Sequence, residues 1–92
     1  MTVEIRFRGP IANRMASPVY KVELPISEDL RNLFERLISM HPEIAELWKT
    51  PEEVDREALI LCNEADIALF DGLDTQVQSG DYIIVLPIVH GG

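Results

Sequence analysis

The chain has a single cysteine, Cys62, and only two histidines, His41 and His90, among its 92 residues. One cysteine excludes a disulfide within the chain and a cysteine-rich metal site, and two imidazoles are too few for a histidine cage. Cys62 ends the apolar stretch 58–62, so we interpret it as a small core residue rather than a reactive thiol. We therefore predict no metal site.

Positive charge is scarce, since 8 lysines and arginines stand against 16 aspartates and glutamates and the formal net charge is −8. Proteins that bind nucleic acids usually carry a basic face, and none is apparent in this sequence, so we expect no nucleic-acid partner. The acidic character is explained equally well by solubility and by attraction to a basic protein partner.

Long apolar runs are also missing. None approaches the roughly 18 residues that a transmembrane helix needs, and residues 1–6 lack the basic head and apolar stretch of a signal peptide. We therefore expect no membrane partner and a cytoplasmic location. Gly9, Gly72 and Gly80 are isolated, so the chain has no glycine-rich phosphate loop and we expect it to bind no cofactor.

Five segments have the patterns of β-strands. Apolar residues alternate with charged ones over 3–7 and 20–24, which predicts an antiparallel hairpin with a long loop. Shorter apolar segments at 58–62 and 67–70 predict a third and a fourth strand. The segment 82–86 is apolar almost throughout, which favours a central strand with neighbours on both sides.

One long helix is predicted between the second and third strands. Ser27 is a good N-cap, followed by two acidic residues in the first turn. The apolar residues of 30–38 recur at three- and four-residue spacing, and the proline after His41 stops the helix. The segment 42–49 is predicted to form one or two further turns, and the charged segment 50–57 a loop.

The element order is therefore β-β-α-β-β-β. One helix must cover one face of a mixed sheet of about five strands, which predicts an α+β fold of the β-grasp, or ubiquitin-like, type. In that layout the last strand lies in the middle of the sheet, parallel to the first. We expect one domain over residues 1–92, with a flexible C-terminal tail over about 88–92.

The chain ends in two glycines, Gly91 and Gly92. Because they have no Cβ, a narrow channel in another protein can admit the terminal carboxylate. Pro87 lacks an N–H, so it can end the sheet pairing and aim the tail outward. The tail, fully extended, spans at most about 16–18 Å. We expect five residues to enter a partner's active site: Ile88, Val89, His90, Gly91 and Gly92.

The residues Gly72-Leu-Asp-Thr75, Ser79-Gly-Asp81 and Pro87-Ile-Val-His-Gly-Gly92, read with the strand before Pro87, carry a family resemblance. They resemble the MoaD/ThiS family of ubiquitin-like sulfur carriers, and within it the small subunits of molybdopterin synthase. The strand containing Phe7 and the predicted helix also fit, so the resemblance spans nearly the whole chain.

The resemblance implies a chemistry for Gly92. A C-terminal carboxylate is ionised at neutral pH and is a poor acyl donor until it is activated. The implied partner is an adenylating enzyme of the ubiquitin-activating type, which uses ATP and allows sulfur to replace one oxygen as a thiocarboxylate. The implied acceptor is a pterin precursor bound by the large synthase subunit, in a heterotetramer. Phe7, Leu86 and Pro87 would then contribute to partner docking, although Phe7 fits the core equally well.

No side chain is predicted to be catalytic, so the chain is expected to be a carrier and not an enzyme. Asp71, Asp74 and Asp81 are explained as turn residues whose side chains bond the backbone. His90 could orient the thiocarboxylate or assist proton transfer, but a solvated histidine or one that packs against a partner is favoured.

Two further functions stay open. Within the same family, the chain could carry sulfur for tRNA thiolation or act as a ubiquitin-like protein modifier. In a different class, it would be a β-grasp protein-binding module whose diglycine is incidental.

Overall fold

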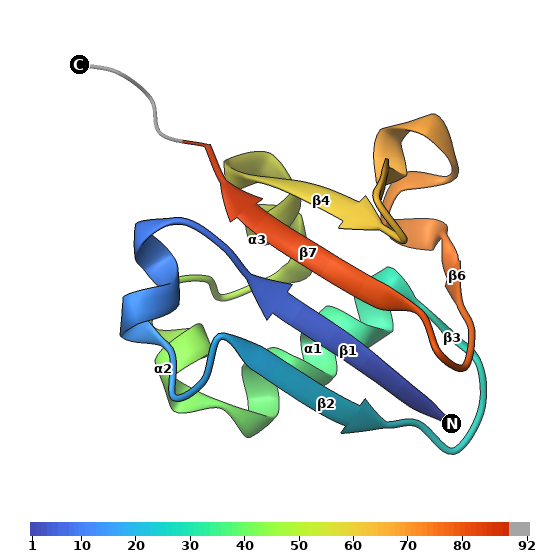
Figure 1. The fold of residues 1–92 in the computed structure, drawn as a ribbon, viewed down its shortest axis with the longest axis horizontal. Helices are drawn as coiled ribbons and strands as arrows, with labels where there is room; N and C mark the ends of the chain where they lie inside the picture. Colours follow the sequence, from blue (N-terminus) through green and yellow to red (C-terminus); the bar gives the residue numbers. More distant parts are fainter. Residues whose placement is uncertain (89–92) are drawn as a thin grey trace.

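A mixed five-stranded sheet with helices on one face forms the protein (Figure 1). The structure is a computed structural model that describes residues 1–88. The strand order is β2-β1-β7-β4-β5. Its strands are β1 (Thr2–Phe7), β2 (Val19–Glu23), β4 (Ala58–Cys62), β5 (Ala65–Asp66) and β7 (Tyr82–Pro87). A second small sheet pairs β3 (Glu28–Asp29) with β6 (Gln76–Val77).

Helices connect the strands. The α-helices are α1 (Leu30–Met40), α2 (Pro42–Ala45) and α3 (Pro51–Glu57), and the 3-10 helices are η1 (Pro10–Arg14), η2 (Ile67–Leu69) and η3 (Gly72–Asp74). No helix within residues 1–88 is both long and apolar enough to cross a membrane.

The central strand is β7, as its apolar sequence predicts. It pairs in parallel with β1, where Ile83 lies opposite Ile5, and antiparallel with β4, where Val85 lies opposite Ile60. All four of these side chains are buried against the helices. This topology confirms the predicted β-grasp fold, and it places the end of β7 at one end of the sheet.

The predicted hairpin and helix stripe are confirmed. Strands β1 and β2 pair antiparallel, and the long loop between them contains η1. The stripe of α1 is buried in the core, with Ile38 partly buried at its margin: Leu30, Leu33, Phe34 and Leu37. The helix ends at Met40 with His41 as its C-cap, so the proline after His41 acts as predicted.

The predicted N-cap of α1 is wrong by two residues. Asp29 is the cap, and its carboxylate accepts a hydrogen bond from the backbone N–H of Asn32 at 2.8 Å. Ser27 instead donates its hydroxyl to the carbonyl of Val77 at 2.7 Å. The reason is tertiary, because Glu28 and Asp29 pair with β6 as a strand and the helix starts only after them.

The predicted loop over 50–57 is wrong, because this segment contains α3. The hydroxyl of Thr50 accepts a hydrogen bond from the backbone N–H of Glu53 at 3.2 Å, and Pro51 occupies the first turn. Thr-Pro-Glu-Glu is a helix-start pattern. Only Pro51 and Val54 are buried in this charged segment, too few to show an apolar stripe.

The predicted strand over 67–70 is also wrong. Asn63 and Glu64 have positive φ angles of 50° and 72° and form a tight turn, so pairing with β4 resumes already at Ala65. The carboxylate of Asp66 then accepts a hydrogen bond from the N–H of Ala68 at 2.9 Å and starts η2. Phe70 follows, 55% exposed.

Candidate functional site at the base of the tail

Leu86, Pro87 and Ile88 form the base of the C-terminal tail and are the last residues that the structure describes. The four predicted site residues that follow lie outside the described residues, so their roles stay predictions: Val89, His90, Gly91 and Gly92. The end of β7 is defined by the last residue pair with β4, which joins Pro87 to Ala58. Pro87 is thus the last strand residue, as its missing N–H predicts.

Ile88 is anchored, although it was predicted to begin the free tail. Its backbone N–H donates to the carbonyl of Glu57 at 2.9 Å, at the C-terminus of α3. Its side chain is nevertheless 51% exposed. The helix that the sequence did not predict therefore holds the base of the tail in place.

The face of the sheet opposite the helices carries an apolar patch. In β7 and β4 alternate side chains are buried, so the residues between them face outward. Leu59 lies opposite Leu86, and Leu61 lies opposite Ile84. We call these four residues the open-face patch; Leu86 is 39% exposed and the other three are partly buried. The predicted docking residue Leu86 belongs to this patch, which lies next to the base of the tail.

Phe7 is not part of that surface. It faces the helices, is 2% exposed, and stacks on Trp48 with ring centroids 6.4 Å apart. Its edge-to-face partner on the other side is Tyr20, at 5.5 Å. Of the two roles considered for Phe7, the structure supports the core role, and its docking role is corrected because its ring is fully packed.

Comparison with protein families matches residues 14–92 to the ThiS family. The chain belongs to the ThiS family. It is thereby one of the ubiquitin-like sulfur carriers, which confirms the resemblance drawn from the tail and the Ser79–Asp81 turn. Carriers of the ThiS and MoaD type are generally small and non-catalytic.

Three known proteins illustrate the breadth of the ThiS-family likeness. Human ubiquitin-related modifier 1 is 32% identical over 101 residues, covering 100% of this chain and 96% of that protein. SAMP1 from Haloferax volcanii shares the fold, with a TM-score of 0.78 and 19% identity over 100% of both chains. A chain in the complex of subunits 1 and 2 of molybdopterin-converting factor from Helicobacter pylori 26695 has a TM-score of 0.64 and 27% identity, again over 100% of both chains.

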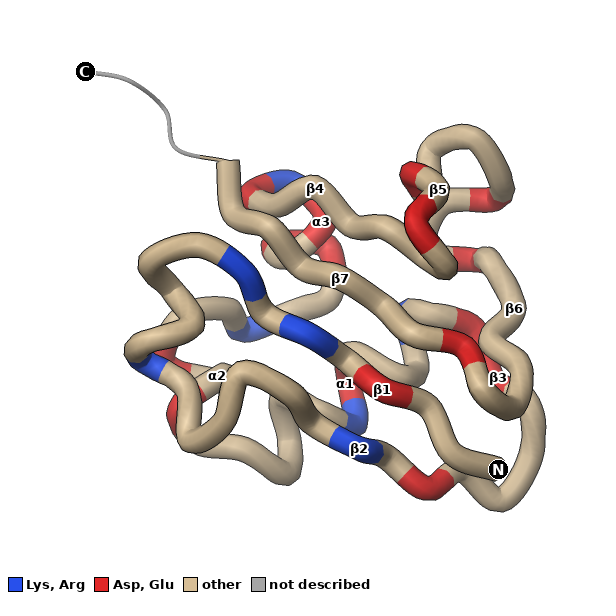
Figure 2. Tube along the Cα trace, viewed as in Figure 1, with Lys and Arg blue, Asp and Glu red and all other residues tan. Residues whose placement is uncertain are grey.

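Cationic side chains flank the open-face patch of this ThiS-family chain, despite its net negative charge. Figure 2 shows basic residues along β1, beside β7. Arg6 lies opposite Ile84 in the β1–β7 pairing. Its guanidinium sits 4.3 Å from the ring centroid of Tyr82, and its Nη2 is 2.9 Å from a carboxylate oxygen of Glu4. These contacts hold Arg6 in one orientation beside the apolar residues.

Other titratable groups have structural roles. Burial raises the pKa of the Cys62 thiol, and the nearby charge of Asp81 adds to the rise. One carboxylate oxygen of Asp81 accepts from the backbone N–H of Gln78 at 2.7 Å, which confirms its predicted role in the turn. Asp74 differs from its prediction, because its carboxylate pairs with Arg31. Within residues 1–88 no three histidine, cysteine or acidic side chains cluster as a metal site would require.

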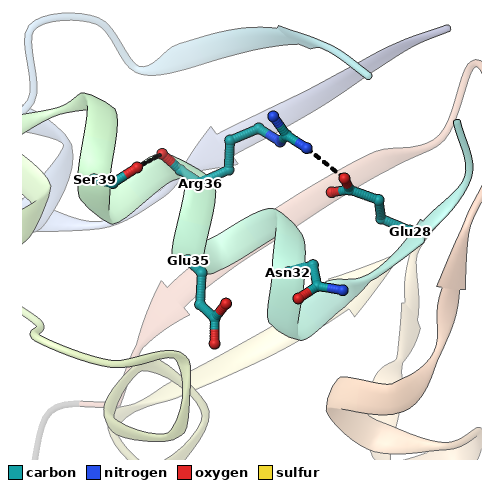
Figure 3. A pocket seen from close by; sticks show the side chains of 5 residues that line it. All are labelled: Glu28, Asn32, Glu35, Arg36 and Ser39. Carbon is teal, nitrogen blue, oxygen red and sulfur yellow. Dashed lines mark hydrogen bonds and ion pairs between the residues drawn. The ribbon is translucent and has the colours of Figure 1, made fainter. Parts of the chain in front are cut away.

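A polar hollow of about 420 Å³ lies on the outer side of α1 (Figure 3). Its lining residues are Glu28, Asn32, Glu35, Arg36 and Ser39. The guanidinium of Arg36 points toward Glu28 and pairs with its carboxylate, so the two main charges neutralise each other. The hollow is therefore best explained as the space around an ion pair that ties α1 to β3.

Proposed function

We propose that this ThiS-family chain is a sulfur carrier for molybdopterin synthesis and acts as the small subunit of molybdopterin synthase. The terminal carboxylate of Gly92 is the group that carries the sulfur. The observation that carries the proposal is the diglycine ending, three residues beyond the central strand of a β-grasp fold whose family is that of the sulfur carriers. The likeness to the molybdopterin-converting factor chain supports the choice of pathway.

The chemistry divides between this chain and its partners. An adenylating enzyme of the ubiquitin-activating type joins the Gly92 carboxylate to AMP from ATP and releases pyrophosphate. Hydrosulfide supplied by a donor then attacks the activated carbonyl carbon, so that a carbon–sulfur bond forms, the bond to AMP breaks and AMP leaves. The resulting thiocarboxylate enters the large synthase subunit, where two such sulfurs convert the pterin precursor to a dithiolene. This chain contributes presentation and docking, and no group of its own takes part in bond making except the terminal carboxylate.

The docking surface in this account is the open-face patch. It surrounds the end of β7, so a protein that takes up the tail from that end must approach the patch as well. A few residues near the centre of an interface typically supply most of the affinity. Because the guanidinium of Arg6 is paired with Glu4, the patch is expected to contribute apolar contact rather than a free charge.

The proposal is tested by reconstitution with proteins of the same genome. The chain is first converted to its thiocarboxylate, then mixed with the large synthase subunit and the pterin precursor. Formation of dithiolene in proportion to the thiocarboxylate consumed supports the proposal. Consumption of thiocarboxylate without dithiolene, or none at all with a folded complex present, contradicts the molybdopterin pathway.

A second function within the family is supported by a specific observation. Human ubiquitin-related modifier 1 is similar along nearly its entire length, so a role in tRNA thiolation or as a protein modifier competes with the molybdopterin role. In that case the same activated chain transfers sulfur to tRNA, or its Gly92 carbonyl forms isopeptide bonds with lysines of other proteins. Sulfur-labelled tRNA or isopeptide-linked peptides in a strain that lacks pterin conversion would favour this second function.

A further inference from the structure

A small apolar hollow of about 160 Å³ lies at the base of the tail, on the other side of β7 from the open-face patch. Pro87 continues the alternation of the buried residues Ile83 and Val85, so it faces the helix side of the sheet. In Figure 1 the end of β7 emerges beside α3 and the segment that follows β1. Six residues line the hollow: Ile11, Leu47, Trp48, Glu57, Pro87 and Ile88.

The floor of this hollow is buried, and five of its six lining residues are apolar. Trp48 is 3% exposed and stacks on Phe7, and both Ile11 and Leu47 pack against the core. The wall formed by Ile88 is held by its hydrogen bond to the carbonyl of Glu57. The hollow thus has a defined shape, and its volume suits one bulky side chain.

Among the described residues, Glu57 is the only charged residue that lines the hollow. Its backbone carbonyl is used by Ile88, whereas its side chain is exposed at the rim. The negative charge of the Glu57 carboxylate favours a partner with a basic side chain next to the apolar side chain that fills the hollow. On the opposite side of β7 the guanidinium of Arg6 is already paired with the carboxylate of Glu4, so a charged group of the partner is expected only beside the hollow.

We propose that this hollow receives a bulky apolar side chain of the adenylating partner, with a basic side chain of that partner beside Glu57. The inference rests on the proposed function, since a protein that activates the Gly92 carboxylate must approach within the tail's reach of Ile88. That reach is at most about 16–18 Å for residues 88–92, so the surface around the hollow is continuous with the surface that meets the tail. The adenylating partner is the occupant because every carrier function of this chain requires activation first.

Contacts on both sides of β7 give the partner a way to set the direction of the tail. The open-face patch meets an apolar surface, and the hollow meets an apolar side chain with a basic group. A partner that binds with the tail reversed or rotated loses both matches at once. The hollow is in this sense a specificity determinant for activation.

The test measures binding of the adenylating enzyme from the same genome by titration calorimetry. Ile11→Phe fills the hollow from its partly buried rim, and Glu57→Lys reverses its charge while the backbone carbonyl remains. Each variant is expected to weaken binding at least about tenfold, which is more than truncation of most interface residues costs. The loss in Glu57→Lys should shrink as salt is raised, because the interaction it removes is exposed. Asp55→Lys, on the same helix and outside the lining, is the matched control and is expected to change affinity less than about twofold.

Trp48 provides a second readout, because it is the only tryptophan of the chain and lines the hollow. A chain labelled with 5-fluorotryptophan gives one fluorine resonance, and titration with the unlabelled enzyme should shift it. The enzyme is expected to shift the resonance of Asp55→Lys equally and that of Ile11→Phe much less at matched occupancy. A resonance that stays unchanged at saturation, or wild-type affinity in both hollow variants, overturns the proposal.

Failure of the hollow and failure of the carrier function give different results. If the wild-type chain gains sulfur and both hollow variants bind and react normally, the proposed role of the hollow is wrong. The proposed carrier function is then unaffected. A folded wild-type chain that neither binds the adenylating enzyme nor gains sulfur overturns both proposals. Melting curves of the variants establish that each is folded before binding is compared.

Discussion

A substitution of Leu86 tests most directly whether the open-face patch binds the partner proteins. Its side chain is 39% exposed and lies beside Gly9, where an added Cβ would sit 3.5 Å from its Cδ1. Leu86→Asp places a charge in the open-face patch at the end nearest the tail, and Leu86 is not a residue of the buried core, so folding should be retained. Binding to the adenylating enzyme and to the large synthase subunit should weaken at least about tenfold.

The matched control for that variant is Leu69→Asp. Leu69 is 77% exposed on η2, which follows β5, and β5 pairs with the end of β4 remote from the tail. It therefore introduces the same charge on an exposed apolar residue away from the proposed interface. Equal losses in both variants, measured by calorimetry, would mean that the effect is one of overall charge and that the patch assignment is wrong.

Cys62 is predicted to take no part in sulfur transfer. Burial raises the pKa of its thiol, and the nearby charge of Asp81 adds to the rise, while the thiolate is the reactive form. A thiol reagent at mildly alkaline pH should label the native chain at least about tenfold more slowly than the guanidinium-unfolded chain. Cys62→Ala should gain sulfur at Gly92 as the wild type does. Loss of sulfur transfer in a folded Cys62→Ala chain would show that the thiol is an intermediate.

The raised thiol pKa also has a consequence for stability. Because the folded pKa lies above the unfolded value, burial of the neutral thiol stabilises the fold below the unfolded pKa, and this contribution is lost as pH rises through the folded pKa. Tyr20 acts in the same direction, since burial and its hydrogen bond to Glu43 raise its pKa. Stability is therefore expected to decline on the alkaline side, and Cys62→Ala should remove part of that decline.

At the scale of single residues, the chemistry of the tail can be predicted from the sequence, whereas the packing of Phe7 cannot. A diglycine and a preceding proline carry their own chemistry wherever the fold places them. Phe7 alternates with charged residues, which shows that it faces one side of the sheet but not which side the helices cover. The sequence also does not show that Ile84 lies on the open face, because a central strand is apolar on both faces.

The four long strands are easier to predict from sequence than the short elements, since the two-residue strands β3, β5 and β6 leave no readable pattern. A period of two is visible within five residues, so β1 and β2 were recognised, and the unbroken apolar runs of β4 and β7 stand out from their polar flanks. Helix α3 has seven residues and buries only two of them, so no stripe develops and its cap is the only signal. The N-cap of α1 was misplaced because pairing between β3 and β6, which are distant in sequence, takes up the residues before it.

The N-cap of α3 is predicted to matter for the tail as well as for the helix. Thr50→Ala removes the side-chain acceptor for the N–H of Glu53 and should lower the free energy of unfolding by about 1 kcal/mol. Since the carbonyl of Glu57 at the other end of α3 holds Ile88, hydrogen exchange at the Ile88 amide should accelerate in this variant.

Guanidinium unfolding and amide exchange check this prediction together. Asp55→Ala is the control on the same helix and should change stability by less than about 0.5 kcal/mol. If Thr50→Ala leaves both the unfolding midpoint and the exchange at Ile88 unchanged, α3 does not restrain the base of the tail in the way proposed.

At the scale of the whole molecule, the proposed role of the fold is to present the terminal carboxylate of Gly92 to its partners. The central position of β7 gives it partners on both sides, so the residue from which the tail departs is fixed by two strands and a helix. The hollow could not be predicted from sequence, because η1, the segment between α2 and α3, α3 itself and β7 each contribute to it and only the topology brings them together. The proposed chemistry of the tail follows from its residue types, whereas the surfaces around its base are formed only in the tertiary structure.

Intact-mass spectrometry of the chain after incubation with the adenylating enzyme, ATP and a sulfur donor tests the central claim most directly. The account predicts a species in which one oxygen has been exchanged for sulfur, with fragmentation placing the sulfur on Gly92. A chain lacking Gly92 should melt like the wild type, because the core is built from residues within 1–88, and should gain no sulfur. A folded wild-type chain that forms no such species, or that carries the sulfur on Cys62 instead, would contradict the account.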